Sequence, residues 1–370
     1  MRQRAMPVRD LTGRQQAHLV QVEAGLTYEF LITLTAYGLP EEQPTYEIGA
    51  HWFEKVRKES SKPLLAALDR IGNQAGKVWV NLIGLATSSP ATRDVPSFLR
   101  RVEALQPLDL RLYLLGFHVP HYQQSISREV LHRAAEGDPE AQGRLLEDGS
   151  YFGGHAEASL GRLLALTPEQ TRAVAMEAMR GWYAEVFRSR EAELEPVLLR
   201  DAEAKRRLLA TMPSDQVIEA ASGVQFVAHP GIRQVYLIPQ LTTRPWVWLA
   251  EHDDARLYCY PVADESLGAG ESEPPGRLVR LHKALGDEKR LRMLRELATS
   301  SATLQELADR FGLPKSTAHH HLAILRSAGL VRVSSDEEHR YSVRRDVIPE
   351  MSSLLAAYLG PEEERRAREA

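Results

Sequence analysis

Residues 303–327 read TLQELADRFGLPKSTAHHHLAILRS, a pattern typical of two short helices joined by a tight turn. Thr303 and Glu306 have the spacing of a capping box, in which each side chain satisfies a free backbone amide at the start of a helix. Gly312 directly follows the apolar residues of that helix and supplies the left-handed conformation that ends it. Because only two residues then precede the next helical pattern, we predict a helix-turn-helix. The two predicted helices span Thr303–Phe311 and Lys315–Ser327.

The second helix has an apolar face and a polar face. Ala318, Leu322 and Leu325 lie at spacings of four and three, so they share one side of the helix and are expected to face the core. Short polar side chains fill the rest of its first turns. Hydroxyls and imidazoles of this kind can bond base edges in the major groove, or phosphates. The candidate DNA contacts on this helix are Lys315, Ser316, Thr317, His319 and His320.

The segment after this helix predicts a β-hairpin. Residues 330–343 read LVRVSSDEEHRYSV, two alternating runs around a polar turn, and Gly329 ends the preceding helix. Arg332 and Arg340 flank the hairpin as candidate phosphate or minor-groove contacts. Phosphate would repel the acidic tip, so we expect only the base of the hairpin to approach DNA. The residues of that tip are Asp336, Glu337 and Glu338.

Helical patterns on both sides complete a winged helix. Leu281 and Leu285 repeat on one helical face with Leu278, and Asp287 is placed to cap the next helix. A last predicted helix over 347–359 carries an apolar stripe that only a charged tail follows. A two-fold partner covering that stripe would set two recognition helices about 34 Å apart, one turn of DNA. The expected dimer interface comprises Leu278, Leu281, Val347, Met351, Leu354, Leu355 and Tyr358.

Three segments together resemble the winged helix of the ArsR/SmtB family of bacterial transcriptional regulators. They read ALGDEKRLRMLREL, LQELADRFGLPKSTAHHHLAILRSAGLV and HRYSV, all in the C-terminal part of the chain. The resemblance implies a dimer that binds an imperfect palindrome, usually as a repressor that a signal releases. It adds Tyr341 to Arg332 and Arg340 as a wing contact with DNA. The chain lacks the cysteine pair that many metal sensors of this family carry in the helix matching TLQELAD, so thiolate metal sensing is not expected.

Composition and charge describe the rest of the chain. Its 370 residues are 43% hydrophobic and 26% charged, which is typical of a globular protein with more than one folding unit. No apolar run is long enough for a membrane span and the start lacks a signal peptide, so we expect a cytoplasmic protein with no membrane partner. Residues 276–349 hold 14 Lys and Arg against 9 Asp and Glu, whereas residues 1–275 hold 29 against 36. The basic part is therefore the C-terminal one, which fits contact with a polyanion.

The chain divides at a segment of linker composition. Residues 263–276, ADESLGAGESEPPG, combine glycine, proline, serine and acidic residues without an apolar period. Residues 1–262 read as a mainly helical region, and the period-two runs after Gly223 predict three or four short antiparallel strands. Residues 277–360 form the predicted winged helix and residues 361–370 a charged tail. The expected fold class is mainly α with a small antiparallel β-sheet.

The N-terminal region carries no motif that specifies an enzyme or a cofactor. The lone Cys259 excludes sites built from several thiolates, and its alternating neighbours favour a small buried apolar role. His118 and His121 offer two metal ligands without a third, so ordinary structural histidines are the preferred interpretation. Consecutive helical residues such as His319–His321 point about 100° apart and do not converge on one ion. We therefore expect no cofactor, no metal and no enzymatic activity.

The favoured hypothesis is a homodimeric transcriptional regulator that binds double-stranded DNA, with an N-terminal region that senses a small-molecule or protein effector. A cluster of aromatic residues could line an effector pocket, although aromatic residues that alternate along strands are more often core. That cluster is Trp246, Trp248, Tyr258 and Tyr260. Two alternatives stay open: an N-terminal enzyme fused to a regulatory winged helix, and a winged helix used for protein contacts. Clustered His and Glu side chains in a deep pocket would favour the first, and an occluded recognition helix the second.

Overall fold

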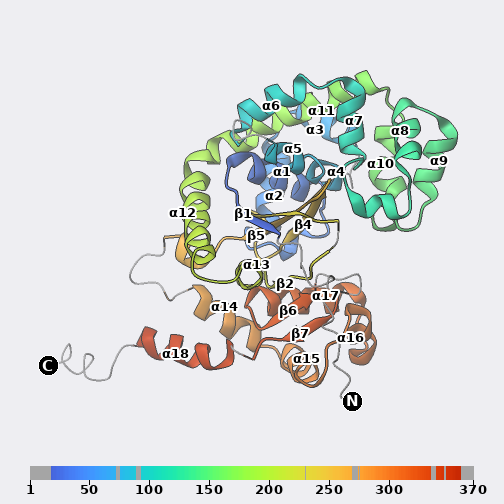
Figure 1. Cartoon of the computed structure of the whole chain (residues 1–370). Coiled ribbons are helices and arrows are strands. Elements are labelled where there is room, and N and C mark those ends of the chain that lie inside the picture. The colour runs from blue at the N-terminus through green and yellow to red at the C-terminus, as the bar shows by residue number, and fades with distance from the viewer. Residues whose placement is uncertain are drawn as a thin grey trace, which may run out of the picture.

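A computed structural model places a small β-sheet between a helical body and a winged helix (Figure 1). It describes residues 18–71, 76–88, 93–229, 231–268, 274, 276–334, 339–345 and 347–359. The fold is mainly helical with small sheets, as the sequence predicted. Within the described ranges, no helix has the length and apolar character needed to cross a membrane.

The sheet is mixed rather than antiparallel, which corrects the prediction. Its order is β1-β3-β5-β4, and only β4 with β5 forms an antiparallel pair. The central strand β3 runs parallel to both β1 and β5. Strands β3 and β5 are buried on both faces, as parallel strands usually are, and side-chain alternation carries no information on strand direction. The strands span Leu19–Val22 (β1), Gln234–Gln240 (β3), Trp248–His252 (β4) and Ala255–Pro261 (β5).

Helices form the body around this sheet. Several of them begin at a side chain that accepts a hydrogen bond from a free backbone amide: Asp94, Ser127, Asp138 and Thr167. These helices bury a large apolar core that includes Phe30, Phe98 and Trp182. The helices are α1 (Leu26–Tyr37), α2 (Ala50–Glu59), α3 (Lys62–Ile71), α4 (Gly76–Val80), α5 (Ile83–Thr87), α6 (Val95–Glu103), α7 (Pro107–Leu114), α8 (Arg128–Glu136), α9 (Pro139–Glu147), α10 (Ala156–Leu164), α11 (Pro168–Trp182), α12 (Glu191–Leu209) and α13 (Ser214–Ser222).

The winged helix has the predicted order of elements. Its helices are α14 (Gly276–Leu285), α15 (Glu288–Thr299), α16 (Leu304–Phe311), α17 (Lys315–Ser327) and α18 (Val347–Leu359). Strands β6 (Val331–Ser334) and β7 (Tyr341–Val343) form the antiparallel hairpin of the wing. The acidic tip, Asp336 to Glu338, and the charged tail, 361–370, lie outside the described residues.

The two parts of the chain share one hydrophobic core. Val217 and Val235 from the N-terminal region belong to the same buried cluster as Leu281 and Leu322 from the winged helix. In addition, β2 (Val224–Gln225), from the N-terminal region, pairs in parallel with β6 of the wing. In Figure 1, α13 and β2 lie between the central sheet and the winged helix. The period-two pattern at β2 correctly predicts a strand, but this strand belongs to the sheet of the wing and not to the four-stranded sheet.

Candidate nucleic-acid interface

The helix-turn-helix forms as the sequence predicted. The Thr303 hydroxyl accepts from the Glu306 amide at 3.2 Å, and the Glu306 carboxylate accepts from the Thr303 amide at 2.8 Å. This capping hydrogen bond is the main reason that the pKa of Glu306 is lowered. Gly312 ends α16 at a φ of 59°, where a side chain would be strained. The turn therefore directs the chain straight into α17.

The two faces of α17 differ in exposure as expected. Ala318, Leu322 and Leu325 are fully buried in the shared core. His321 is also buried, 3.9 Å from Asp287, the residue that caps α15. Among the candidate DNA contacts, Thr317 is half-buried and the others are exposed: Lys315, Ser316, His319 and His320. The helix thus presents a short-chained polar face on an apolar foundation, the arrangement that a major-groove reader needs.

The candidate wing residues are bound within the chain. Arg332 forms an ion pair with Glu219 of α13 at 2.8 Å. Arg340 pairs with Glu306 at 3.2 Å, so it braces the start of α16. Tyr341 is only 8% exposed and packs in the core, because its backbone bridges to Ala302 and turns the ring inward. In this arrangement Tyr341 supports the wing and is not available to DNA.

The residues expected at the dimer interface fall into a buried group and a more exposed group. Leu278, Leu281 and Val347 are buried inside the chain, since α14 and the start of α18 pack on the core. They do not contribute to an external surface, which corrects that part of the prediction. Met351 and Leu354 are half-buried, whereas Leu355 and Tyr358 are exposed. The apolar surface that α18 offers therefore lies toward its C-terminal end.

A loop from the N-terminal region contacts α17. Residues 241–247 connect β3 to β4, and Trp246 in this loop lies against His319, with ring centroids 4.8 Å apart. The guanidinium of Arg326, also on α17, lies 5.6 Å from the centroid of the same indole. Although part of the His319 side chain is exposed, the protein packed around its ring desolvates the charged form and lowers its pKa, and the nearby charge of Arg326 lowers it further, so the neutral imidazole is favoured here. The sequence did not indicate this contact.

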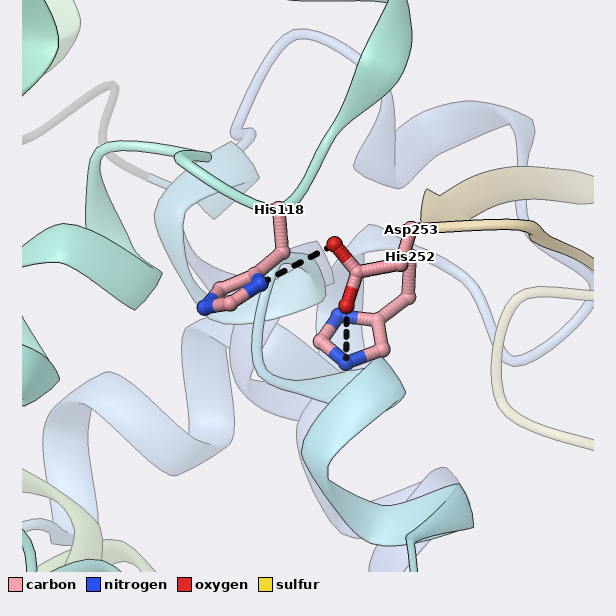
Figure 2. A group of neighbouring side chains, drawn as sticks. All are labelled: His118, His252 and Asp253. Carbon is pink, nitrogen blue, oxygen red and sulfur yellow. Dashed lines mark hydrogen bonds and ion pairs between the residues drawn. The ribbon is translucent and has the colours of Figure 1, made fainter. Parts of the chain in front are cut away.

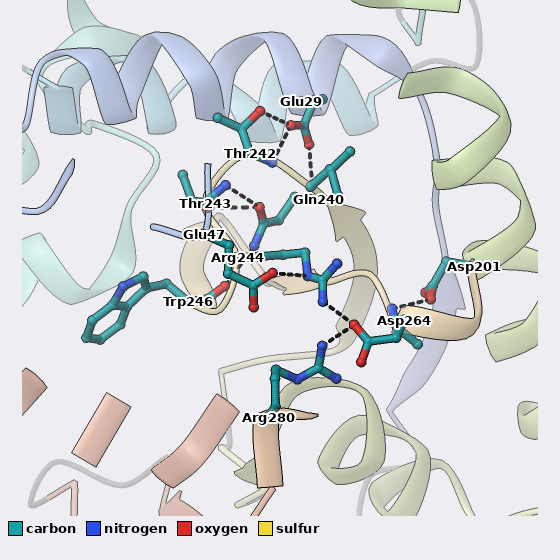
Figure 3. A network of polar contacts seen from close by, with 12 residues as sticks. Glu29, Glu47, Asp201, Gln240, Thr242, Thr243, Arg244, Trp246, Asp264 and Arg280 are labelled. Atoms are coloured by element: carbon teal, nitrogen blue, oxygen red, sulfur yellow. Dashed lines mark hydrogen bonds and ion pairs between the residues drawn. The ribbon is translucent and has the colours of Figure 1, made fainter. Parts of the chain in front are cut away.

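A buried polar network fixes the 241–247 loop (Figure 3). The carboxylate of Glu29, fully buried in α1, accepts from the amides of Leu241 and Thr242 at 2.8 and 2.7 Å. Gln240 donates to the carbonyl oxygen of Trp246 at 2.8 Å. Each of these bonds has a fully buried side chain, Glu29 or Gln240, at one end, so the loop is anchored to the body of the chain.

The same network reaches the first helix of the winged helix. Arg244 is 4% exposed and pairs with Glu47 at 3.4 Å and with Asp264. Arg280 of α14 pairs with the same Asp264 carboxylate, as Figure 3 shows. Asp264 falls in the predicted linker 263–276, whose first residues are thus packed against the body; residues 269–273 and 275 lie outside the described part. The 241–247 loop therefore contacts α17 directly and is linked to α14 through Asp264.

A cavity of about 460 Å³ lies beside this contact. Its walls come from both parts of the chain, with Val247 and Leu249 from the N-terminal region and Lys315 and His319 from α17. Of the aromatic cluster considered as a pocket, Tyr258 and Tyr260 are fully buried core residues. Cys259 is buried as well, as predicted.

Comparisons with known proteins address the same segment. Residues 285–334 match the family model described as a helix-turn-helix domain. The chain is 37% identical over 70 residues to the uncharacterized HTH-type transcriptional regulator YceK of Bacillus subtilis (strain 168), a match that covers 18% of this chain and 70% of that protein. No solved structure matches. With the helix-turn-helix and its wing in place, the chain belongs to the HTH-type transcriptional regulators.

Proposed function

We propose that the chain is a sequence-specific DNA-binding repressor in which α17 reads the major groove. The observation that carries this proposal is the exposed polar start of α17, set on a buried apolar face and joined to α16 by a turn too short for another geometry. Lys315 would contact phosphate, and Ser316, Thr317 and His320 would contact base edges or phosphates. Resemblance to the ArsR/SmtB winged helix favours repression over activation.

A selection from random duplexes tests this proposal. The full chain selects its preferred duplex, and the affinity for that duplex is then measured for a variant with Ser316→Ala, Thr317→Ala and His320→Ala. Each lost base contact is expected to cost about 1–3 kcal/mol. The matched control removes one serine, one threonine and one histidine that are exposed outside the winged helix, with Ser189→Ala, Thr211→Ala and His132→Ala, and is expected to bind normally. Equal affinity of both variants, with folding intact, would contradict the assignment.

The N-terminal region is proposed to act as the sensor. Trp246 lies on His319, and Glu219 neutralises Arg332, so this region occupies groups that DNA would otherwise use. Lys315, Ser316 and His320 remain exposed, so the cover over α17 is partial. This favours regulated DNA reading over a winged helix dedicated to protein contacts. An effector that shifts the 241–247 loop would change the fraction of protein able to bind DNA.

A homodimer on a palindromic operator is the proposed assembly. Leu355 and Tyr358 are 37% and 47% exposed on α18, with Leu359 at 50% beside them. An apolar stripe of this kind is stabilised when a two-fold copy covers it, and that symmetry places two α17 helices on successive major grooves. Sedimentation equilibrium of Leu355→Glu tests the dimer. The variant is expected to be a monomer and the unchanged chain a dimer. If both proteins are dimers, α18 is not the interface.

A further inference from the structure

Three side chains from two distant parts of the sequence converge in the N-terminal region (Figure 2). His118 follows α7, whereas His252 ends β4 and Asp253 begins the turn to β5. The Asp253 carboxylate lies 3.2 Å from His118 Nδ1 and 3.7 Å from His252 Nε2. One ligand atom from each residue lies within 4.8 Å of the other two. The sequence paired His118 with His121, but the structure brings it to His252 and Asp253 instead.

The surrounding structure fixes the positions of these side chains. The Asp253 amide donates to the His118 carbonyl oxygen at 2.8 Å, which ties the β4–β5 turn to the loop after α7. The ring of Tyr113 stacks on both imidazoles, at centroid distances of 4.5 Å from His118 and 5.8 Å from His252. A side chain at Gly84 would lie 2.2 Å from the His252 ring, so only glycine leaves room for it. The imidazoles are therefore held by packing, independently of any ion.

We propose that His118, His252 and Asp253 bind a divalent transition-metal ion of the zinc class. Two imidazoles and one carboxylate are a common three-ligand set for zinc, cobalt, nickel and ferrous iron. Ligand atoms around such an ion are about 3.3 Å apart for bonds of about 2.1 Å, so the site closes by roughly an ångström. The Asp253 carboxylate is already close to both imidazoles, so the closure must come mainly from the His118 ring, which is 27% exposed at its side chain and lies on the loop after α7. The exposure of Asp253, 49% at its side chain, leaves the remaining coordination positions open to water.

The charge of the site fits this occupant. Arg128 lies 3.4 Å from the Asp253 carboxylate and is 52% exposed. This guanidinium holds the carboxylate when no ion is bound and competes with the metal. Removing it should therefore tighten metal binding.

Titration of the chelator-treated full chain with Co²⁺ and Zn²⁺ tests the site. Visible absorption reports Co²⁺ coordination, and calorimetry gives the Zn²⁺ stoichiometry and affinity. The chain is expected to bind one ion, with affinity lowered at least about tenfold by His118→Ala, His252→Ala or Asp253→Asn and raised by Arg128→Ala. His121→Ala removes the neighbouring imidazole that lies outside the cluster and is expected to bind normally. Circular dichroism confirms that each variant is folded.

Two results would overturn the proposal. One is the absence of Co²⁺ and Zn²⁺ binding by the folded full chain. The other is binding that survives His118→Ala and His252→Ala but is lost when His319 and His320 are replaced by alanine, which would place the ion on α17. Because none of these measurements involves DNA, failure of the metal site leaves the proposed DNA-binding function unaffected.

Discussion

Replacing Trp246 by alanine should strengthen DNA binding. The indole packs on His319 and lies beside the Arg326 guanidinium, and these contacts hold the 241–247 loop against α17. The aromatic contact contributes about 0.5–1.5 kcal/mol and the cation–π contact about 0.5–2 kcal/mol. Their loss shifts the equilibrium between covered and uncovered α17 by about 1–3.5 kcal/mol, or about 5- to 400-fold. Apparent affinity for DNA rises by up to that factor, because only the uncovered fraction binds.

Fluorescence anisotropy with the selected duplex measures this effect. Trp52→Ala is the matched control, since Trp52 of α2 makes an aromatic contact with Phe53 and a cation–π contact with Arg190 instead of contacts with α17. We expect tighter binding for Trp246→Ala and unchanged binding for Trp52→Ala. Unchanged or weaker binding by a folded Trp246→Ala variant would refute the idea that the loop competes with DNA.

Three further predictions concern the wing, the core and the cap. Glu219→Gln releases Arg332, so the slope of log affinity against log salt should steepen by about 0.9 for one added phosphate contact; an unchanged slope means that Arg332 does not reach DNA. Leu322→Ala removes a fully buried side chain and should lower the free energy of unfolding by about 2–5 kcal/mol in urea titrations, and a loss below about 1 kcal/mol would count against the shared core. The pKa of Glu306 is lowered in the folded chain, so its stabilising effect is present above its unfolded pKa and is lost as pH falls through the folded value. Glu306→Gln should therefore flatten the acid limb of stability against pH, measured by thermal melts, and an unaltered acid limb would exclude this role.

The helix-turn-helix could be predicted because local rules determine it. The Thr303 capping box, the left-handed Gly312 and the spacing of Ala318, Leu322 and Leu325 each depend on residues a few positions apart. The structure confirms all of them, with α17 at the predicted bounds.

Features that depend on contacts between distant segments could not be predicted. Alternation along β3 and β5 indicates strands, but it is the same for parallel and antiparallel neighbours. The pairing of Arg244 and Arg280 through Asp264 joins residues that look like ordinary surface charges in the sequence. The contact of Trp246 with α17 likewise depends on how two regions pack. These interactions set how much of α17 is exposed, so the sequence predicted the helix-turn-helix but not the loop that packs on it.

Methylation protection of guanine N7 tests the central claim most directly. This atom lies in the major groove, where a recognition helix contacts base edges. The full chain bound to its selected duplex should protect guanines in two half-sites about one helical turn apart. The variant with Ser316→Ala, Thr317→Ala and His320→Ala should lose that protection at concentrations where the control variant keeps it. The contradicting result is a fully bound duplex whose half-sites contain guanine but show no protection at any N7. In that case α17 would not be the helix that reads DNA.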